Sequence, residues 1–210
     1  MIFVNFTFYL VYIDDCEERP LNLLKTGDLL FVRTDNTDAL SRQIAAATQI
    51  TTTERTMNYT HVGFLEEATA NCFWVMHASP RKGCCREALA DFLQENQTGV
   101  DAYRLQGQQI DYTAVTQRAR QLLGSPYNFS FIADQPGYYC SEFICTIFKQ
   151  AKLFKSIPMQ FGPDKQILPA WQDYYQQLKL SVPVGQFGSS PNSLIAQTFP
   201  QHLKFIARIV

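Results

Sequence analysis

A cysteine at the start of a predicted helix is the residue best suited to covalent chemistry. In GYYCSEFICTIF, residues 137–148, Pro136 and Gly137 prevent an earlier helix start, and apolar residues recur at helical spacing after Cys140. Unpaired backbone N–H groups and the helix dipole favour an anion there, and the same N–H groups can hold an oxyanion during acyl transfer. Cys140 is therefore a candidate nucleophile, and we expect its alkylation well below the free-thiol pKa of about 8.5.

Cys140 also has a structural interpretation, because free cysteine is among the residues most often buried in protein cores. Cys145 lies well inside the same predicted helix, where a core position is the better interpretation. A thiol nucleophile needs a base, so the histidines bear on the choice between the two interpretations.

Two of the three histidines lie at ends of predicted strands. His61 begins HVGF, and His77 ends FWVMH. If strands over 61–65 and 73–78 pair antiparallel around a turn at 66–71, the two imidazoles become near neighbours, within about 5.5 Å across the sheet. His61 is then the candidate general base and His77 the candidate third residue that orients it. For His77, a satisfied core histidine is the open alternative.

The carboxylates near these motifs have structural interpretations. Asp28 follows a glycine and is interpreted as a turn or cap residue. Glu66 and Glu67 fall in the predicted hairpin turn, where we expect them to be solvated. Glu142 lies in the first turn of the Cys140 helix, where a negative side chain complements the helix dipole.

The six cysteines predict reduced thiols rather than a disulfide framework, because the chain is long enough to fold without covalent links. A zinc site is conceivable from four residues, Cys72, His77, Cys84 and Cys85. Their spacing lacks the paired pattern of structural zinc sites. We therefore expect no metal and no organic cofactor.

The elements that position these residues are short strands and helices. Strands are predicted over 29–32, 61–65, 73–78, 99–105 and 204–210, and helices over 37–50, 86–96, 111–124 and 140–152. This pattern predicts an α+β fold with a mostly antiparallel sheet. With 46% hydrophobic residues, a net charge of −1 and no run of Lys or Arg, the chain is globular and nucleic acid is not expected as a partner.

The first 21 residues are harder to assign. Residues 2–13 are nearly all apolar or aromatic, but no Lys or Arg precedes Arg19 and no small-residue cleavage motif is present. We interpret residues 1–21 as an edge strand or as a degenerate or clipped export signal. Export would favour the cell envelope over the cytoplasm, and the run is too short for an integral membrane span. The catalytic domain is expected over 22–210, with 153–210 a proline- and aromatic-rich C-terminal extension.

Four motifs in order resemble the YiiX/YebB-like proteins, which are circularly permuted, papain-like cysteine hydrolases of the NlpC type. The motifs are LKTGDLLF, THVGF, LLGSPYNFSF and YYCSEFICTIF, within about residues 22–152. The resemblance implies Cys140 as nucleophile, His61 as base and a polar third residue at His77, where many permuted relatives carry glutamate. Tyr139 and Tyr59 are candidates for lining the oxyanion region.

The same resemblance implies the reaction. A thiol hydrolase of this type cleaves an amide or ester through a Cys140 thioester, and the leading expectation is a peptidase or amidase. The substrate is a small peptide, a cell-wall fragment or an acyl lipid. Two alternatives stay open: a lipid acyltransferase or thioesterase of the same fold, and a non-catalytic ligand-binding module.

Overall fold

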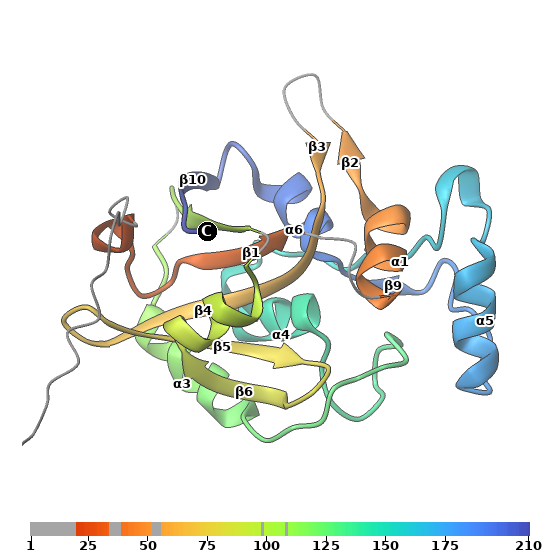
Figure 1. Cartoon of the computed structure of the whole chain (residues 1–210), viewed down its shortest axis with the longest axis horizontal. Helices are drawn as coiled ribbons and strands as arrows, with labels where there is room; N and C mark the ends of the chain where they lie inside the picture. The colour runs from red at the N-terminus through yellow and green to blue at the C-terminus, as the bar shows by residue number, and fades with distance from the viewer. Residues whose placement is uncertain (1–19, 34–38, 52–55, 98, 108) are drawn as a thin grey trace, which may run out of the picture.

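One six-stranded antiparallel sheet forms the frame of the protein, as the computed structural model in Figure 1 shows. The structure describes residues 20–33, 39–51, 56–97, 99–107 and 109–210. The strands lie in the order β10-β7-β1-β4-β5-β6. Their bounds are β1 (Leu29–Arg33), β4 (Tyr59–Thr69), β5 (Cys72–Ser79), β6 (Gly83–Ala88), β7 (Val100–Leu105) and β10 (Leu203–Arg208).

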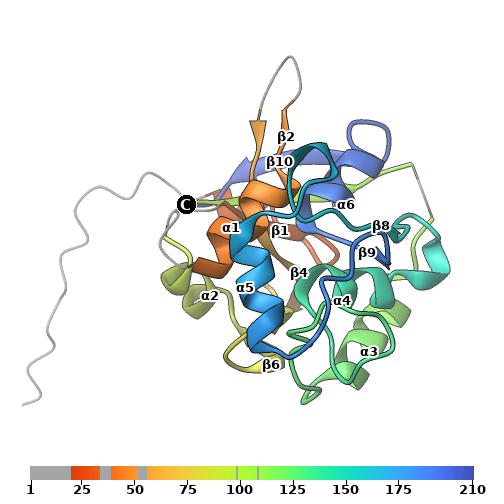
Figure 2. The same ribbon diagram turned by 90° about the vertical axis from the view of Figure 1, so that its right-hand side faces the viewer.

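Helices cover both faces of this sheet. The α-helices are α1 (Ala39–Thr48), α2 (Leu89–Glu95), α3 (Tyr112–Leu122), α4 (Cys140–Ile147), α5 (Pro169–Gln177) and α6 (Pro191–Thr198). Figure 2 shows α2 on the opposite side of the sheet from α3 and α4. The short elements are β2 (Ile50–Thr51), β3 (Thr56–Met57), β8 (Ile157–Pro158), β9 (Phe187–Gly188) and the 3-10 helices η1 (Pro20–Leu23), η2 (Lys149–Ala151) and η3 (Pro163–Lys165).

The alternation of side chains along β4 divides the core in two. Val62 and Phe64 contribute to the larger apolar cluster, which α3, α4 and α6 complete. Leu65 contributes to the smaller cluster, with Phe92 from α2. Because successive strand residues point to opposite faces, His61 shares the face of Leu65. This places the His61 imidazole on the side of α2, in agreement with a ring-centroid distance of 6.2 Å to Phe92.

The β4–β5 hairpin is longer than predicted. Its strands continue to Thr69 and Cys72, so the turn is confined to residues 70–71, and Asn71 there has a left-handed φ of 62°. Glu66 therefore lies inside a strand, and its side chain is buried rather than solvated. At the other end, the regular pairing stops at Phe64 and Met76. The two strands are thus no longer paired where His61 is located.

The helix predicted over 86–96 is in fact two elements. Arg86, Glu87 and Ala88 belong to β6, and α2 begins only at Leu89. These three residues favour helices by local propensity, but their pairing with β5 holds them extended. The strand conformation matters for the site, because it places the Glu87 carboxylate beside His77 of β5.

The Cys140 helix begins where the sequence predicts. The Glu142 carboxylate accepts a hydrogen bond of 3.3 Å from the backbone N–H of Tyr139, so it caps the helix start, as expected for an acidic first-turn residue. Phe143, Ile144 and Ile147 are buried against the sheet. The α-helix ends at Ile147 and the 3-10 helix η2 follows it. The α-helix is therefore shorter than the predicted helix over 140–152.

The C-terminal segment adds β10 to the sheet edge and places α6 against β4. Asn192 of α6 accepts a hydrogen bond from the backbone N–H of Tyr59 and donates to its carbonyl oxygen. Residues 1–19, with the predicted edge strand or export signal, lie outside the described residues, as do residues 37 and 38 at the start of the first predicted helix. Among the described residues, no helix has the length and apolarity needed to cross a membrane.

Candidate active site

Two histidines and a glutamate form a hydrogen-bonded chain at the separated end of β4 and β5. His61 Nε2 lies 2.7 Å from His77 Nδ1, which confirms that the two imidazoles are neighbours. His77 Nε2 lies 2.7 Å from Glu87 Oε1 in β6. Lys82 Nζ donates to the other carboxylate oxygen at 2.5 Å. All three members of the chain lie on the face covered by α2.

The carboxylate fixes where the protons lie in this chain. The hydrogen bond from His77, with help from Lys82, lowers the pKa of Glu87 to about 2, so the carboxylate is ionised and can only accept. His77 Nε2 must therefore carry a proton. In neutral His77 the other nitrogen, Nδ1, then accepts from His61 Nε2–H. This leaves His61 Nδ1 with a free lone pair, as a general base requires.

Cys140 occupies a more enclosed position than the sequence predicts. Only 4% of the residue is exposed, and this burial raises the pKa of the thiol to about 12. The backbone N–H groups of Val62, Ser141 and Cys140 itself point at the sulfur and partly counteract the effect. The expectation of a depressed thiol pKa is therefore wrong for the structure shown: the helix N-terminus supplies donors, but desolvation of the thiolate is the larger effect.

Cys140 and His61 approach each other from opposite faces of the sheet. The sulfur reaches the backbone N–H of Val62, the residue that follows His61, from the side of α4. In the part of the chain that the structure describes, no hydrogen bond joins the sulfur to the His61 ring. Loss of hydration lowers the pKa of His61 to about 3, with a smaller effect from His77. At rest the thiol and the imidazole are therefore both neutral. Catalytic hydrogen bonds of this kind are often absent without substrate and form only when it is bound.

This resting state predicts slow alkylation of Cys140 at neutral pH. Because thiolate is the reactive form and its pKa is raised, the iodoacetamide rate should keep rising with pH beyond the free-thiol value of about 8.5. The measurement is the rate at each pH, read by peptide mass, with exposed Cys72 as the reference thiol in the same chain. A plateau of Cys140 labelling near pH 6 would instead mean a preformed thiolate–imidazolium pair.

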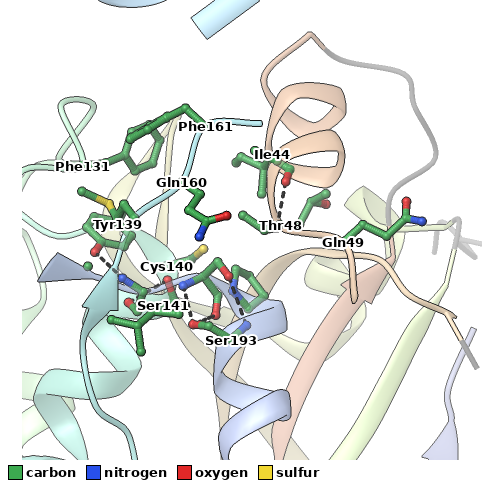
Figure 3. Close-up of a pocket in the computed structure, with 18 of the residues that line it drawn as sticks. Ile44, Thr48, Gln49, Phe131, Tyr139, Cys140, Ser141, Gln160, Phe161 and Ser193 are labelled. Atoms are coloured by element: carbon green, nitrogen blue, oxygen red, sulfur yellow. Dashed lines mark hydrogen bonds between the residues drawn. The ribbon is translucent and has the colours of Figure 1, made fainter. Parts of the chain in front are cut away.

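An apolar pocket of about 330 Å³ opens beside the thiol. Figure 3 shows Cys140 and Ser141 at its base, with Gln160 extending its amide toward the sulfur. Aromatic and aliphatic side chains from several segments form most of the remaining wall: Ile44, Ala47, Tyr127, Phe131, Phe161 and Trp171. Polar residues also line the pocket: Thr48, Gln49, Thr60, Ser189, Ser190 and Ser193. The thiol thus faces a cavity able to hold an apolar group.

The two tyrosines proposed from the sequence have different positions. Tyr139 lines the pocket, and its hydroxyl accepts a hydrogen bond of 3.1 Å from the backbone N–H of Ser189. Tyr59 does not line it: its hydroxyl lies 2.5 Å from a carboxylate oxygen of Asp101, in a buried network. Tyr139 therefore lies near the thiol, whereas Tyr59 belongs to a buried hydrogen-bond network away from the pocket.

Two further residues near the site were missed by sequence reasoning. Glu87 was hidden by the predicted helix over 86–96. The alternation of GCCREA would have placed Cys85 and Glu87 on one face beside His77, had β6 been recognised as a strand. Gln160 carries no local signal, because it lies in a segment without regular structure between β8 and η3.

Other candidate residues have structural partners. Asp28 is fully buried and pairs with Arg104 at 2.7 Å. Glu66 pairs with Arg86 at 2.7 Å and also with Arg120. Of the conceivable zinc ligands, only His77 and Cys85 come together: Cys84 is buried in the cluster on the α4 face, and Cys72 is exposed at the far end of β5.

Comparison with known proteins identifies the class. The model of the permuted papain-like amidase family YaeF/YiiX, C92, matches residues 23–176, and the chain belongs to this family. The predicted α+β, permuted papain-like fold and the assignment to amidase and peptidase enzymes are thereby confirmed.

A solved structure supports the same fold. The structure titled metalloprotein yiiX from Escherichia coli O157:H7 superposes with a TM-score of 0.69 at 20% sequence identity, covering 88% of this chain and 97% of that one. Among curated proteins, no sequence matches.

Proposed function

We propose that the protein is a cysteine amidase that cleaves an acyl bond through a thioester on Cys140. His61 acts as base and His77 as the residue that orients it. The observation that carries the proposal is a helix-terminal thiol beside an acyl-sized pocket, whose sulfur meets the backbone N–H of Val62, the residue next to His61. From His61 a histidine chain runs to a carboxylate. Family membership supports the reaction class.

The proposed reaction begins with attack of the Cys140 sulfur on a carbonyl carbon as the thiol proton passes to His61 Nδ1. The new positive charge on the imidazole is stabilised along the chain to the Glu87 carboxylate. Backbone N–H groups at the start of α4 are positioned to hold the oxyanion, and the Gln160 amide is close to the same place. His61 then protonates the leaving group, and water releases the acyl group.

A neutral resting dyad is compatible with this mechanism. When substrate displaces water, the proton transfer can accompany bond formation, so a free thiolate never has to accumulate. The three backbone N–H groups around the sulfur favour its charge as it develops. The site therefore supports a general-base mechanism, in which His61 accepts the thiol proton during attack, better than a mechanism that starts from a preformed thiolate–imidazolium pair.

A lipid acyltransferase or thioesterase is the second candidate, and the pocket favours it. Its walls are mostly apolar, with the aromatic rings of Phe131, Phe161 and Trp171 packed edge to face at centroid distances of 5.1 and 5.9 Å. An acyl chain needs such walls, whereas a polar cell-wall peptide needs paired donors and acceptors. In both candidates the covalent step at Cys140 is the same.

Trapping the acyl-enzyme tests the proposal and separates the two substrate classes. We expect a mass adduct on the Cys140 peptide after brief incubation with p-nitrophenyl esters, removed by hydroxylamine as a thioester should be. Adducts that accumulate more strongly as the acyl chain lengthens would favour the lipid class. Adducts from N-acyl dipeptide anilides would favour the peptidase class. Absence of any adduct on Cys140 across both series would contradict the proposed nucleophile.

A further inference from the structure

The side chains behind His77 have the composition and spacing of a metal site. Donor atoms of His77, Cys85 and Glu87 all lie within 4.8 Å of one another. Cys85 Sγ is 3.3 Å from His77 Nε2, and Glu87 Oε1 is 2.7 Å from the same nitrogen. Thiolate, imidazole and carboxylate are the three donors that Zn²⁺ accepts, and three protein ligands leave a fourth position open.

The surroundings of these three residues suit a bound cation. His77 Nδ1 already contacts His61 Nε2, which gives the ligating ring the hydrogen-bonded partner that metal-bound histidines usually have. Lys82 holds the far oxygen of Glu87 and is also paired with Glu95 at 2.8 Å, so the near oxygen remains able to bind. Cys85 is half-buried, and it lines a surface cavity together with Glu87, which offers an entry path.

We propose that His77, Cys85 and Glu87 bind a borderline divalent cation such as Zn²⁺, and that the bound ion switches off the His61 base. The ion takes His77 Nε2, Cys85 Sγ and Glu87 Oε1. The inhibitory consequence rests on the proposed role of His61, whereas the metal site itself does not.

The proton balance explains the switch. Coordination removes the proton from His77 Nε2, so neutral His77 carries its proton on Nδ1 and donates it to His61 Nε2. Neutral His61 then carries its own proton on Nδ1, the atom that would otherwise accept the thiol proton. The two imidazoles hold two protons before and after, and the Cys85 thiol loses one to solvent. Binding should therefore release one proton per ion and leave His61 unable to act as base.

Cobalt titration of the full chain tests the site, because Co²⁺ substitutes for Zn²⁺ and reports a thiolate ligand by its near-ultraviolet charge-transfer band. We expect this band in the wild type and in Cys84→Ser. Cys84 precedes the proposed ligand Cys85 in the sequence, but its thiol lies on the α4 face of the sheet. In Cys85→Ser the apparent Kd should weaken by at least about 100-fold, because loss of a ligand should cost no less than loss of an outer-shell partner. Calorimetry in two buffers measures the released proton.

Cys140→Ala distinguishes this site from metal capture by the nucleophile. Retention of the cobalt band in Cys140→Ala supports the proposal, whatever the activity. A band that persists in Cys85→Ser and disappears in Cys140→Ala overturns it, as does the absence of any band in the wild type. Histidine ¹⁵N spectra test the switch without an activity assay: Zn²⁺ should move the His61 proton from Nε2 to Nδ1. If the His61 tautomer stays unchanged with metal bound, the proposed inhibition is wrong, although the proposed metal site still stands.

Discussion

Cys140→Ala should lose nearly all hydrolysis of a p-nitrophenyl ester, with kcat/KM falling by about 10⁴- to 10⁶-fold. Removal of the nucleophile abolishes the thioester path and leaves only binding and oxyanion stabilisation. The fold should survive, because a buried thiol adds little apolar area: we expect a stability loss of about 1 kcal/mol, or about 2–4 °C in Tm for a chain of this size. Steady-state kinetics and thermal unfolding provide the two measurements.

Cys145→Ala is the matched control for that variant. Cys145 is on the same helix and packs at the edge of the same cluster, but it does not line the pocket. Its removal should cost a similar amount of stability and leave kcat/KM within a few-fold of the wild type. Equal losses of activity in both variants would point to damage to the α4 helix rather than to a missing nucleophile.

The parts of the site that follow from local signals could be predicted from the sequence. Pro136 and Gly137 end the preceding loop, so the start of α4 at Cys140 is determined by residues within one turn. The neighbourhood of His61 and His77 follows from an antiparallel hairpin, where a short connection leaves few possible pairings. The exact pairing of the two strands could not be predicted. The hairpin extends further than expected, so Phe64 pairs with Met76 and the two imidazoles meet diagonally rather than directly across the strands.

The parts that depend on tertiary packing could not be predicted. Glu87 lies in a strand because β6 pairs with β5, against the helical preference of its neighbours. The raised pKa of Cys140 arises from burial, to which segments distant in sequence contribute, including Ile44 and Trp171 in the wall of the pocket beside the thiol. The start of an isolated helix is an electropositive environment, which lowers the pKa of a cysteine there. Whether water also reaches the thiol, and so keeps its pKa low, depends on the tertiary fold.

Glu87→Gln should lower kcat/KM by about 10²- to 10⁴-fold, although Glu87 does not touch the pocket. The reason is a change of tautomer. Lys82 Nζ can only donate, so it should hold the amide oxygen of the new side chain and turn the NH₂ group toward His77 Nε2. His77 must then accept there and donate from Nδ1, which places the His61 proton on Nδ1. Kinetics, with histidine ¹⁵N spectra to assign the tautomers, provide the measurement.

Lys82→Met combined with Glu87→Gln tests that reason directly. Without the lysine, the amide can rotate and present its oxygen to His77, which restores the productive tautomer and should recover at least about tenfold of the lost activity, within the range of a general-base effect. Lys82→Met alone retains the carboxylate and should cost far less than Glu87→Gln. A double variant as inactive as Glu87→Gln would show that the negative charge itself, rather than the direction of the hydrogen bonds, is what His61 requires. A Glu87→Gln enzyme of normal activity would remove Glu87 from the positioning of His61 altogether.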